Sequence, residues 1–254
     1  MTSSDFYLKV TTLPLLQGMS AENILIMQER KAIRIVSMEP EEGDIIQEGQ
    51  HCCTLTMLME GTLACITLGE GWTLEEEIIA PAIIEEEALW SLSQTYHHNY
   101  RPLSEGKLLV IDRHHIMKTM LHNDVFRINL LTRMSTRLER NYLCTQTTPP
   151  VNIIQKIARF LQRIASTPTW PKCLNIKMTT LAEIVGETRL QVSKTLRQME
   201  NEGHISLARE KITFNTALTE YRVQSTEHRV QSTEYRAQST EYRVQIREHR
   251  YKIL

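Results

Sequence analysis

The spacing of apolar residues changes twice over the first 146 residues and predicts a succession of different elements. The first 32 residues place apolar side chains at helical spacing, which predicts short helices. From Ile33 to Ile111, short apolar runs alternate with glycines, the pattern of strands joined by turns. From His115 to Gln146 a period of 3.6 returns without Gly or Pro, which predicts one long helix.

The glycine-punctuated region predicts an antiparallel β-sandwich or jelly roll, because its short strands follow one another at roughly even spacing. Another small α+β fold would also place glycines between short apolar runs, so this alternative stays open. The expected strands are 33–36, 45–46, 54–59, 63–68, 77–79 and 108–111.

The predicted long helix has a narrow apolar seam. Ile128, Leu131, Leu138 and Tyr142 recur at three- and four-residue steps or their multiples, and arginines occupy the other side. A long helix with such a seam usually pairs with a second copy of itself. The alternative is that it packs on its own barrel. Two prolines at 149 and 150 end it, and a further helix is expected over 151–166.

Residues 179–214 combine two short helices with a glycine between them. Leu181 and Val185 form a short helical pattern that stops at Gly186, where a positive φ costs nothing. The second helix, 188–201, buries one stripe, formed by Val192, Leu196 and Met199. This arrangement predicts a helix-turn-helix, with a plain helical hairpin as the alternative.

The second helix also has a polar outer face suited to nucleic acid. Its side chains are donors that fit phosphates and base edges. After Gly203, the alternating segments 205–207 and 212–214 predict a small β-hairpin wing. The outer-face residues are Arg189, Gln191, Ser193, Lys194, Arg197 and Gln198.

Charge is segregated along the chain, although the net charge is −1. Residues 1–115 carry 18 acidic and 7 basic side chains, whereas residues 116–254 carry 12 acidic and 22 basic ones. A basic second half suits contact with a polyanion. No apolar run approaches a membrane span, and the five cysteines form no CxxC pair. We therefore expect a cytoplasmic protein with reduced thiols, no membrane contact and no bound metal.

Residues 219–250 repeat a heptapeptide of the type TEYRVQS. Its Tyr or His and its Val or Ala lie two and five residues apart, on nearly opposite sides of a helix, so they form no coiled-coil seam. We expect a disordered basic tail. A nucleic-acid-binding arm is the alternative.

The order of barrel, long helix and winged helix resembles the Crp/Fnr family of transcriptional regulators. The most specific match is IVGETRLQVSK, residues 184–194, with looser matches at Gly43, Gly49 and Gly61. The resemblance implies an α+β chain with an antiparallel jelly-roll domain of the cyclic-nucleotide-binding type (1–114), a dimerisation helix (115–147), a winged helix-turn-helix domain (148–216) and a tail (217–254). It also implies a homodimer, double-stranded DNA and RNA polymerase as partners.

The resemblance places Arg189 and Lys194 where the family's recognition helix carries cations that contact bases and phosphates. Between them, a position often held by Glu is Leu190, which accepts no hydrogen bond but can touch a thymine methyl. The DNA target is therefore expected to differ from that of the cyclic-AMP receptor. The DNA-binding candidates are Thr188, Arg189, Leu190, Gln191, Ser193, Lys194 and Arg197.

The effector region departs from the family pattern. Cyclic-nucleotide binders carry Gly-Glu-Leu-Ala and then an Arg-Ser/Thr pair that holds the phosphate, but here the two positions read Ile84–Leu89 and His97-His98. With acidic segments at 75–77 and 85–87, the region suits a phosphate poorly. No cysteine precedes Cys52, so an iron–sulfur sensor is also disfavoured, and no cofactor is expected. The candidate pocket for an unknown small-molecule effector is Glu86, Glu87, His97, His98, Asn141 and Tyr142.

Three alternatives remain open. The first is a regulator that does respond to a cyclic nucleotide. The second is a metal-dependent β-barrel enzyme, which is disfavoured because the adjacent histidines 97–98 and 114–115 would point to opposite faces of a strand. The third is an effector-free architectural protein in which the barrel only supports a dimer.

Overall fold

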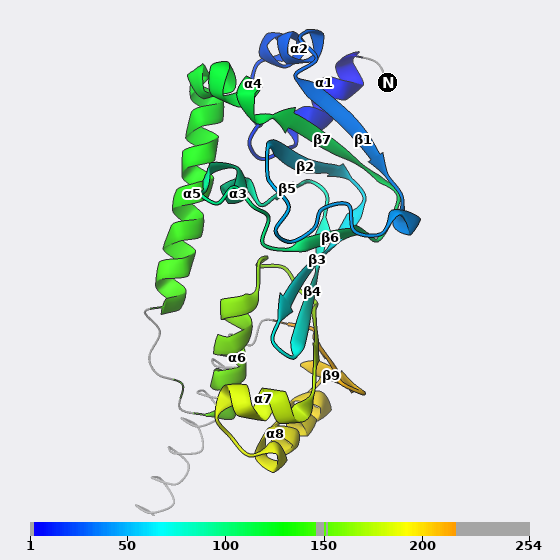
Figure 1. Ribbon diagram of the computed structural model, residues 1–254, viewed down its shortest axis with the longest axis vertical. Helices are drawn as coiled ribbons and strands as arrows, with labels where there is room; N and C mark the ends of the chain where they lie inside the picture. Colours follow the sequence, from blue (N-terminus) through cyan, green and yellow to red (C-terminus); the bar gives the residue numbers. More distant parts are fainter. Residues whose placement is uncertain (1–2, 146–149, 151, 217–254) are drawn as a thin grey trace, which may run out of the picture.

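The computed structural model describes residues 3–145, 150 and 152–216 (Figure 1). A β-rich domain lies at one end, a helical domain with a small sheet lies at the other, and a long helix runs along one side. This confirms the predicted α+β class with antiparallel sheets and a C-terminal helix-turn-helix. The expected tail over 217–254 lies outside the described residues.

Two short helices open the chain, as predicted. They are α1 (Ser3–Thr11) and α2 (Ala21–Glu29), and the Ser20 side chain caps α2 by accepting from Asn23 N. Between them Leu13, Leu15 and Leu16 are completely buried. The N-terminal segment therefore covers one end of the β-domain core.

The first sheet has four antiparallel strands in the order β1-β7-β2-β5. The other strands of this domain belong to a second sheet, in which β3 and β4 form a hairpin and β6 pairs with β3. Gly61 makes the tight turn between β2 and β3 at φ +91°, where a Cβ would lie 2.6 Å from the Glu105 carbonyl oxygen. The strands are β1 (Ile33–Met38), β2 (Thr54–Glu60), β3 (Thr62–Gly69), β4 (Trp72–Ile79), β5 (Ala82–Ile84), β6 (Asn99–Pro102) and β7 (Gly106–Asp112).

Several predicted strands differ from the observed ones. The apolar pair 45–46 forms only an isolated bridge, Ile46 to Tyr100, instead of a strand. The expected strand 77–79 is the end of the longer β4, and β5 and β6 were not predicted. Two short helical segments, η1 (Pro40–Glu42) and α3 (Glu86–Trp90), lie in the loops.

The predicted single helix from His115 is wrong, because the structure divides it. α4 (Arg113–Lys118) and η2 (Met120–His122) precede α5 (Asp124–Thr145). The side chain of Asn123 accepts a hydrogen bond from Phe126 N at 3.1 Å and starts the new helix. The break lets Met120 and Phe126 both enter the core of the β-domain, where they are 1% and 0% exposed.

The C-terminal domain has its own core under the helix-turn-helix. Ile157, Leu161, Leu181, Val192 and Phe214 are among its buried side chains. Its helices are α6 (Ile153–Ile164), α7 (Met178–Val185) and α8 (Arg189–Asn201), and its strands are β8 (Lys172–Ile176), β9 (Ile205–Ala208) and β10 (Lys211–Phe214).

One sheet spans both domains. Its order is β6-β3-β4-β8-β10-β9, since β4 of the N-terminal hairpin pairs antiparallel with β8. Leu74 of β4 is fully buried in the C-terminal core, and the Trp72 ring meets Phe160 of α6 edge-on at 5.5 Å between centroids. The β3–β4 hairpin therefore joins the N-terminal domain to the domain that carries the helix-turn-helix.

Candidate nucleic-acid interface and effector pocket

The turn between α7 and α8 is built by three residues. Gly186 ends α7 in the left-handed conformation, at φ +65° and ψ +43°. Thr188 then caps α8, and its hydroxyl accepts from Gln191 N while the Gln191 side chain accepts from Thr188 N. This reciprocal capping box satisfies donors that the first turn of a helix leaves free. It fixes where α8 begins.

The two faces of α8 differ as predicted. Val192, Leu196 and Met199 are completely buried, which anchors the helix on the C-terminal core. Among the candidate DNA-binding residues, Ser193 is half-buried and the other six are exposed. The exposed set is Thr188, Arg189, Leu190, Gln191, Lys194 and Arg197.

Two of these candidates already have a structural role. The Thr188 hydroxyl donates to Gln191 Oε1 at 2.7 Å, so both side chains hold the cap of α8. Contact of Gln191 with a base would require this pair to open. Leu190 is 80% exposed and projects an apolar side chain from the first turn of α8.

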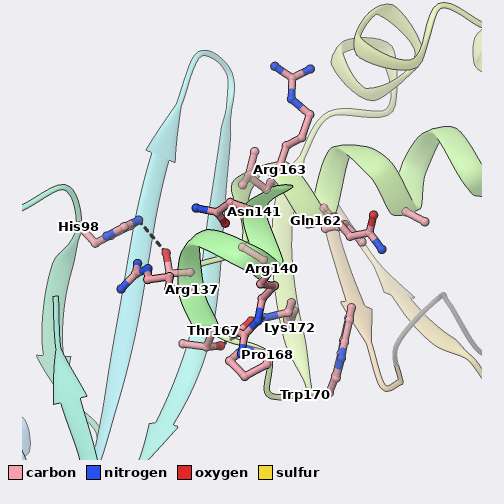
Figure 2. A pocket seen from close by; sticks show the side chains of 15 residues that line it. His98, Arg137, Arg140, Asn141, Gln162, Arg163, Thr167, Pro168, Trp170 and Lys172 are labelled. Atoms are coloured by element: carbon pink, nitrogen blue, oxygen red, sulfur yellow. Dashed lines mark hydrogen bonds between the residues drawn. The ribbon is translucent and has the colours of Figure 1, made fainter. Parts of the chain in front are cut away.

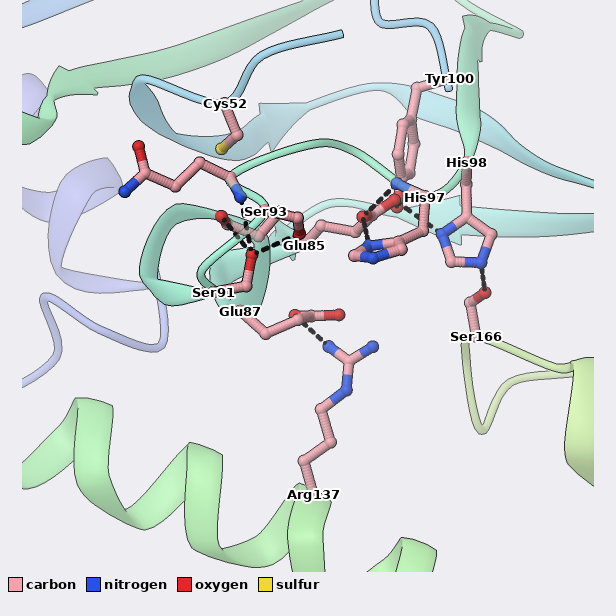
Figure 3. A network of polar contacts seen from close by, with 12 residues as sticks. Cys52, Glu85, Glu87, Ser91, Ser93, His97, His98, Tyr100, Arg137 and Ser166 are labelled. Carbon is pink, nitrogen blue, oxygen red and sulfur yellow. Dashed lines mark hydrogen bonds and ion pairs between the residues drawn. The ribbon is translucent and has the colours of Figure 1, made fainter. Parts of the chain in front are cut away.

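A second set of polar residues surrounds Glu85, at the start of α3 (Figure 3). The Glu85 side chain is 2% exposed, and its backbone has φ +35°. It accepts hydrogen bonds from His97 N at 2.8 Å and from Tyr100 OH at 3.0 Å, and it pairs with His98 Nδ1 at 2.6 Å. Burial raises the pKa of Glu85, but the contacts with His98, His97 N and Tyr100 together outweigh it and leave that pKa lowered.

The next two glutamates bind arginines of α5. Glu86, with a side chain 3% exposed, pairs with Arg133 at 2.9 Å, and Glu87 pairs with Arg137 at 2.5 Å. Burial raises the pKa of Glu87 more than the charge of Arg137 lowers it, so the pKa of Glu87 is raised. The acidic segment 85–87 is therefore neutralised by cations from about fifty positions further along the chain, which the local sequence does not reveal.

In the other acidic segment, 75–77, the central glutamate is also neutralised by a distant cation. Glu76 is 0% exposed and forms an ion pair with Lys172, whose side chain is 2% exposed. The carboxylate also accepts from Ser166 N at 2.7 Å and from Thr167 N at 3.0 Å. Glu76 therefore holds the segment before β8, and it does not line an acidic effector pocket.

The predicted effector residues are only partly brought together. His98 and Asn141 line a cavity of about 550 Å³ between α5, α6 and residues 163–172 (Figure 2). Glu86 and Glu87 lie outside it, in the ion pairs with α5, and the His97 side chain meets Glu85. Tyr142 is 60% exposed on α5.

Sequence reasoning missed the residues that complete this region. They are Arg133 and Arg137 on α5 and Ser166 and Lys172 after α6. The Ser166 hydroxyl meets His98 Nε2 at 2.7 Å and links the N-terminal domain to the C-terminal one. Arginines at 133 and 137 share a helix face through their four-residue spacing, and this was the available signal.

The described residues offer little support for a metal site or a membrane span. No group of three or more potential metal ligands occurs among them, and no helix of the described chain is long and apolar enough to cross a bilayer. Cys52, Cys53, Cys65 and Cys173 are free thiols. Burial raises the pKa of the Cys65 thiol to about 12, which keeps it protonated and unreactive.

Comparison with protein families identifies the C-terminal domain. Residues 155–216 match the family model of the Crp-like helix-turn-helix domain. No curated protein matches the chain. This part of the chain therefore belongs to that domain family, which confirms the resemblance to Crp/Fnr transcriptional regulators.

Three solved structures are similar to this chain at low sequence identity. The Thermus thermophilus catabolite activator protein is 17% identical, with 82% of this chain and 97% of that chain covered and a TM-score of 0.43. The Xanthomonas campestris regulator CLP is 17% identical, with 78% of this chain and 100% of that chain covered and a TM-score of 0.45. DNR from Pseudomonas aeruginosa is 15% identical, with 83% of this chain and 94% of that chain covered and a TM-score of 0.39.

Proposed function

We propose that this protein is a dimeric, cytoplasmic transcriptional regulator that reads a roughly palindromic DNA site with α8. The observation that carries the proposal is the two-faced α8, with three fully buried apolar residues below and exposed Arg189, Lys194 and Arg197 above. A helix presented in this way fits the major groove. In two-fold dimers of this type the half-sites lie about one helical turn, ~34 Å, apart. As a regulator, it is also expected to contact RNA polymerase.

The dimer is proposed through α5, with a second copy of the chain as the partner. Ile128, Leu131, Leu138 and Tyr142 are 60%, 58%, 69% and 60% exposed, although three are strongly apolar. They repeat at the first and fourth positions of a heptad, which is the pairing seam of two helices. A second copy of α5 would remove this seam from water and place two copies of α8 around one axis.

Selection of bound DNA fragments tests whether the protein recognises a specific sequence. Purified protein should enrich a motif with two-fold symmetry from random or genomic fragments. If Arg189 reads a guanine, Arg189→Ala should cost about 1–3 kcal/mol on the selected site and relax the preference at one base pair. Lys194→Ala, acting at phosphate, should weaken all sequences more evenly and flatten the dependence on salt. Recovery of no enriched motif would rule out sequence-specific regulation.

We propose further that cyclic AMP is not the effector. The His97–His98 pair stands where the family resemblance puts the phosphate-binding arginine, and here it meets the buried Glu85 carboxylate. An internal carboxylate satisfies these donors, so a cyclic phosphate would have to displace it and then meet its charge. Burying a second anion beside an ionised carboxylate is unfavourable.

Calorimetry tests this part of the proposal separately from DNA binding. Titration with cyclic AMP or cyclic GMP should give no binding heat, and neither nucleotide should change the affinity for DNA. Only a ligand that prefers one state can shift an equilibrium between states. Micromolar binding of either nucleotide would favour the alternative, a cyclic-nucleotide-responsive regulator. In that case Glu85→Gln should change the affinity for the nucleotide.

A further inference from the structure

Leu190 is an apolar residue in the first turn of α8, and its side chain is 80% exposed. An exposed leucine alone says little, because much of a protein surface is apolar. Its place on the helix is more informative. Successive residues of an α-helix are about 100° apart, so Leu190 lies about 160° around the helix from the buried Val192. It therefore points almost directly away from the C-terminal core.

The same outward face of α8 carries two cations. Lys194 and Arg197 follow Leu190 after four and seven residues, a spacing that puts the three side chains on one side of the helix. Both cations are exposed, and such groups fit the phosphates that border a DNA groove. The apolar side chain of Leu190 therefore lies in line with groups suited to DNA.

The other two residues of the first turn are directed elsewhere. The Gln191 side chain accepts hydrogen bonds from the Thr188 backbone N and hydroxyl in the capping box. Arg189 lies on the side of α8 next to the wing, where it lines a hollow together with Leu207 of β9. Leu190 is thus the first-turn residue at the centre of the outward face.

We propose that Leu190 recognises a thymine by contact with its C5 methyl group in the major groove. This inference rests on the proposed function, because it requires α8 to lie in that groove. The thymine methyl is the apolar group on the base edges there, and the other groups are hydrogen-bond donors and acceptors. A leucine side chain cannot satisfy a donor or acceptor that loses water, so it disfavours the other bases. Leu190 would therefore select a T·A pair at one position of each half-site.

Replacement of thymine by uracil in the selected DNA site tests this contact, because it removes the methyl group and keeps every hydrogen-bonding group of the base. Anisotropy titrations should reveal one position per half-site at which uracil weakens binding about threefold to fourfold, the effect of one lost methyl contact. Changing both half-sites should cost about tenfold. Leu190→Ala should bind the thymine and uracil sites equally. Leu190→Met keeps an apolar side chain of similar size and should keep the preference for thymine.

A control variant and a second modified base make the test specific. Leu8→Ala removes a leucine that is 62% exposed on α1, far from α8 along the chain. It should bind like the parent chain and keep the response to uracil. At the position that responds, cytosine should bind weakly, and 5-methylcytosine should recover part of the affinity because it carries the same methyl group. Leu190→Ala should show no such recovery.

The outcomes separate this contact from the proposed function. Binding to the selected site no tighter than to an unrelated duplex would contradict the proposed function, and the thymine contact with it. Specific binding that no uracil replacement weakens would overturn only the thymine contact. A Leu190→Ala chain that responds to uracil like the parent would also overturn it, because another residue would then contact the methyl group.

Discussion

At the residue scale, three consecutive glutamates show how far local sequence can mislead about charge. Glu85, Glu86 and Glu87 suggest one acidic patch, but each meets a different positive or donating group. At Glu85 the hydrogen bonds overcome burial and lower the pKa, whereas at Glu87 burial prevails and raises it. Neighbouring residues of one type therefore respond to pH in opposite directions.

Glu85→Gln is expected to destabilise the protein by about 1–3 kcal/mol at pH 7, because buried donors lose an ionised acceptor. Since the folded pKa of Glu85 is lowered, its stabilisation is present above the unfolded pKa of about 4.3 and lost as pH falls through the folded value. The free-energy difference between parent and variant, measured by urea unfolding, should therefore shrink as pH falls below the unfolded pKa and approach zero below the folded one.

Glu87→Gln is the control, for which the change in stability with pH should have the opposite sign. The folded pKa of Glu87 is raised, so its ionisation opposes folding as pH rises from the unfolded pKa through the folded one. Relative to this variant, the parent chain should lose stability over that interval. Identical pH profiles for the two variants would contradict the separate environments described for these glutamates.

At the element scale, the parts that sequence predicted well are those fixed by local contacts. Gly186, the cap at Thr188 and the stripe Val192–Leu196–Met199 all act within a few residues, so their pattern defines the helix-turn-helix. The wing strands were also found, because their alternation is short-range. The side of α8 that we propose to face DNA is the one opposite this stripe.

Elements that depend on distant partners were predicted less well. β8 carries the buried Lys172. Its charge is compensated by Glu76, which lies ninety-six residues earlier. The break at Asn123 reflects the burial of Phe126 in a core formed by other segments. The same limit applies to the effector region, because Arg133 and Arg137 reach the 85–87 segment only in the folded chain.

Gly186→Ala tests the turn of the helix-turn-helix. A Cβ at this position would meet nothing within 4 Å, so the cost comes from backbone conformation alone. We expect a loss of about 1 kcal/mol in the free energy of unfolding, because L-residues disfavour a φ of +65°. Gly186→Asn should lose less, since asparagine tolerates this conformation. Equal losses in the two variants would point to another cause.

At the scale of the whole molecule, the sheet that both domains share joins them into one unit. β4 and β8 pair from Trp72–Ile176 to Glu76–Lys172, and the last pair carries a buried ion pair. Lys172→Met should destabilise the chain by about 3–5 kcal/mol, because it leaves the Glu76 carboxylate buried without its cation. Adding Glu76→Gln should recover part of the loss, measured by urea unfolding.

The matched control is Lys211→Ala, which removes an exposed lysine from β10 of the same sheet. Its effect should stay within about 0.5 kcal/mol, as for most surface substitutions. A similar small effect of Lys172→Met would show that the ion pair does not hold the domains together. The domain junction would then depend on the apolar contacts of Trp72 and Leu74.

Pairing along the seam of α5 would allow two copies of the chain to bind one DNA site. Leu138, 69% exposed, should lie near the two-fold axis, and burying it against a second α5 gains free energy because its apolar surface leaves water. Sedimentation at micromolar concentration should give twice the chain mass of 29.5 kDa. Leu138→Asp should give monomers, since two carboxylates would be buried face to face at the seam.

Glu139→Ala is the matched control, because it changes an exposed residue one position away and off the seam. It should leave the dimer intact. If the Leu138→Asp chain stays folded as a monomer, it should lose affinity for a two-half-site DNA far more than for a single half-site. Joining two weak sites raises the effective local concentration of the second α8, and a monomer lacks that gain. A parent chain that sediments as a monomer would rule out α5 as the pairing surface.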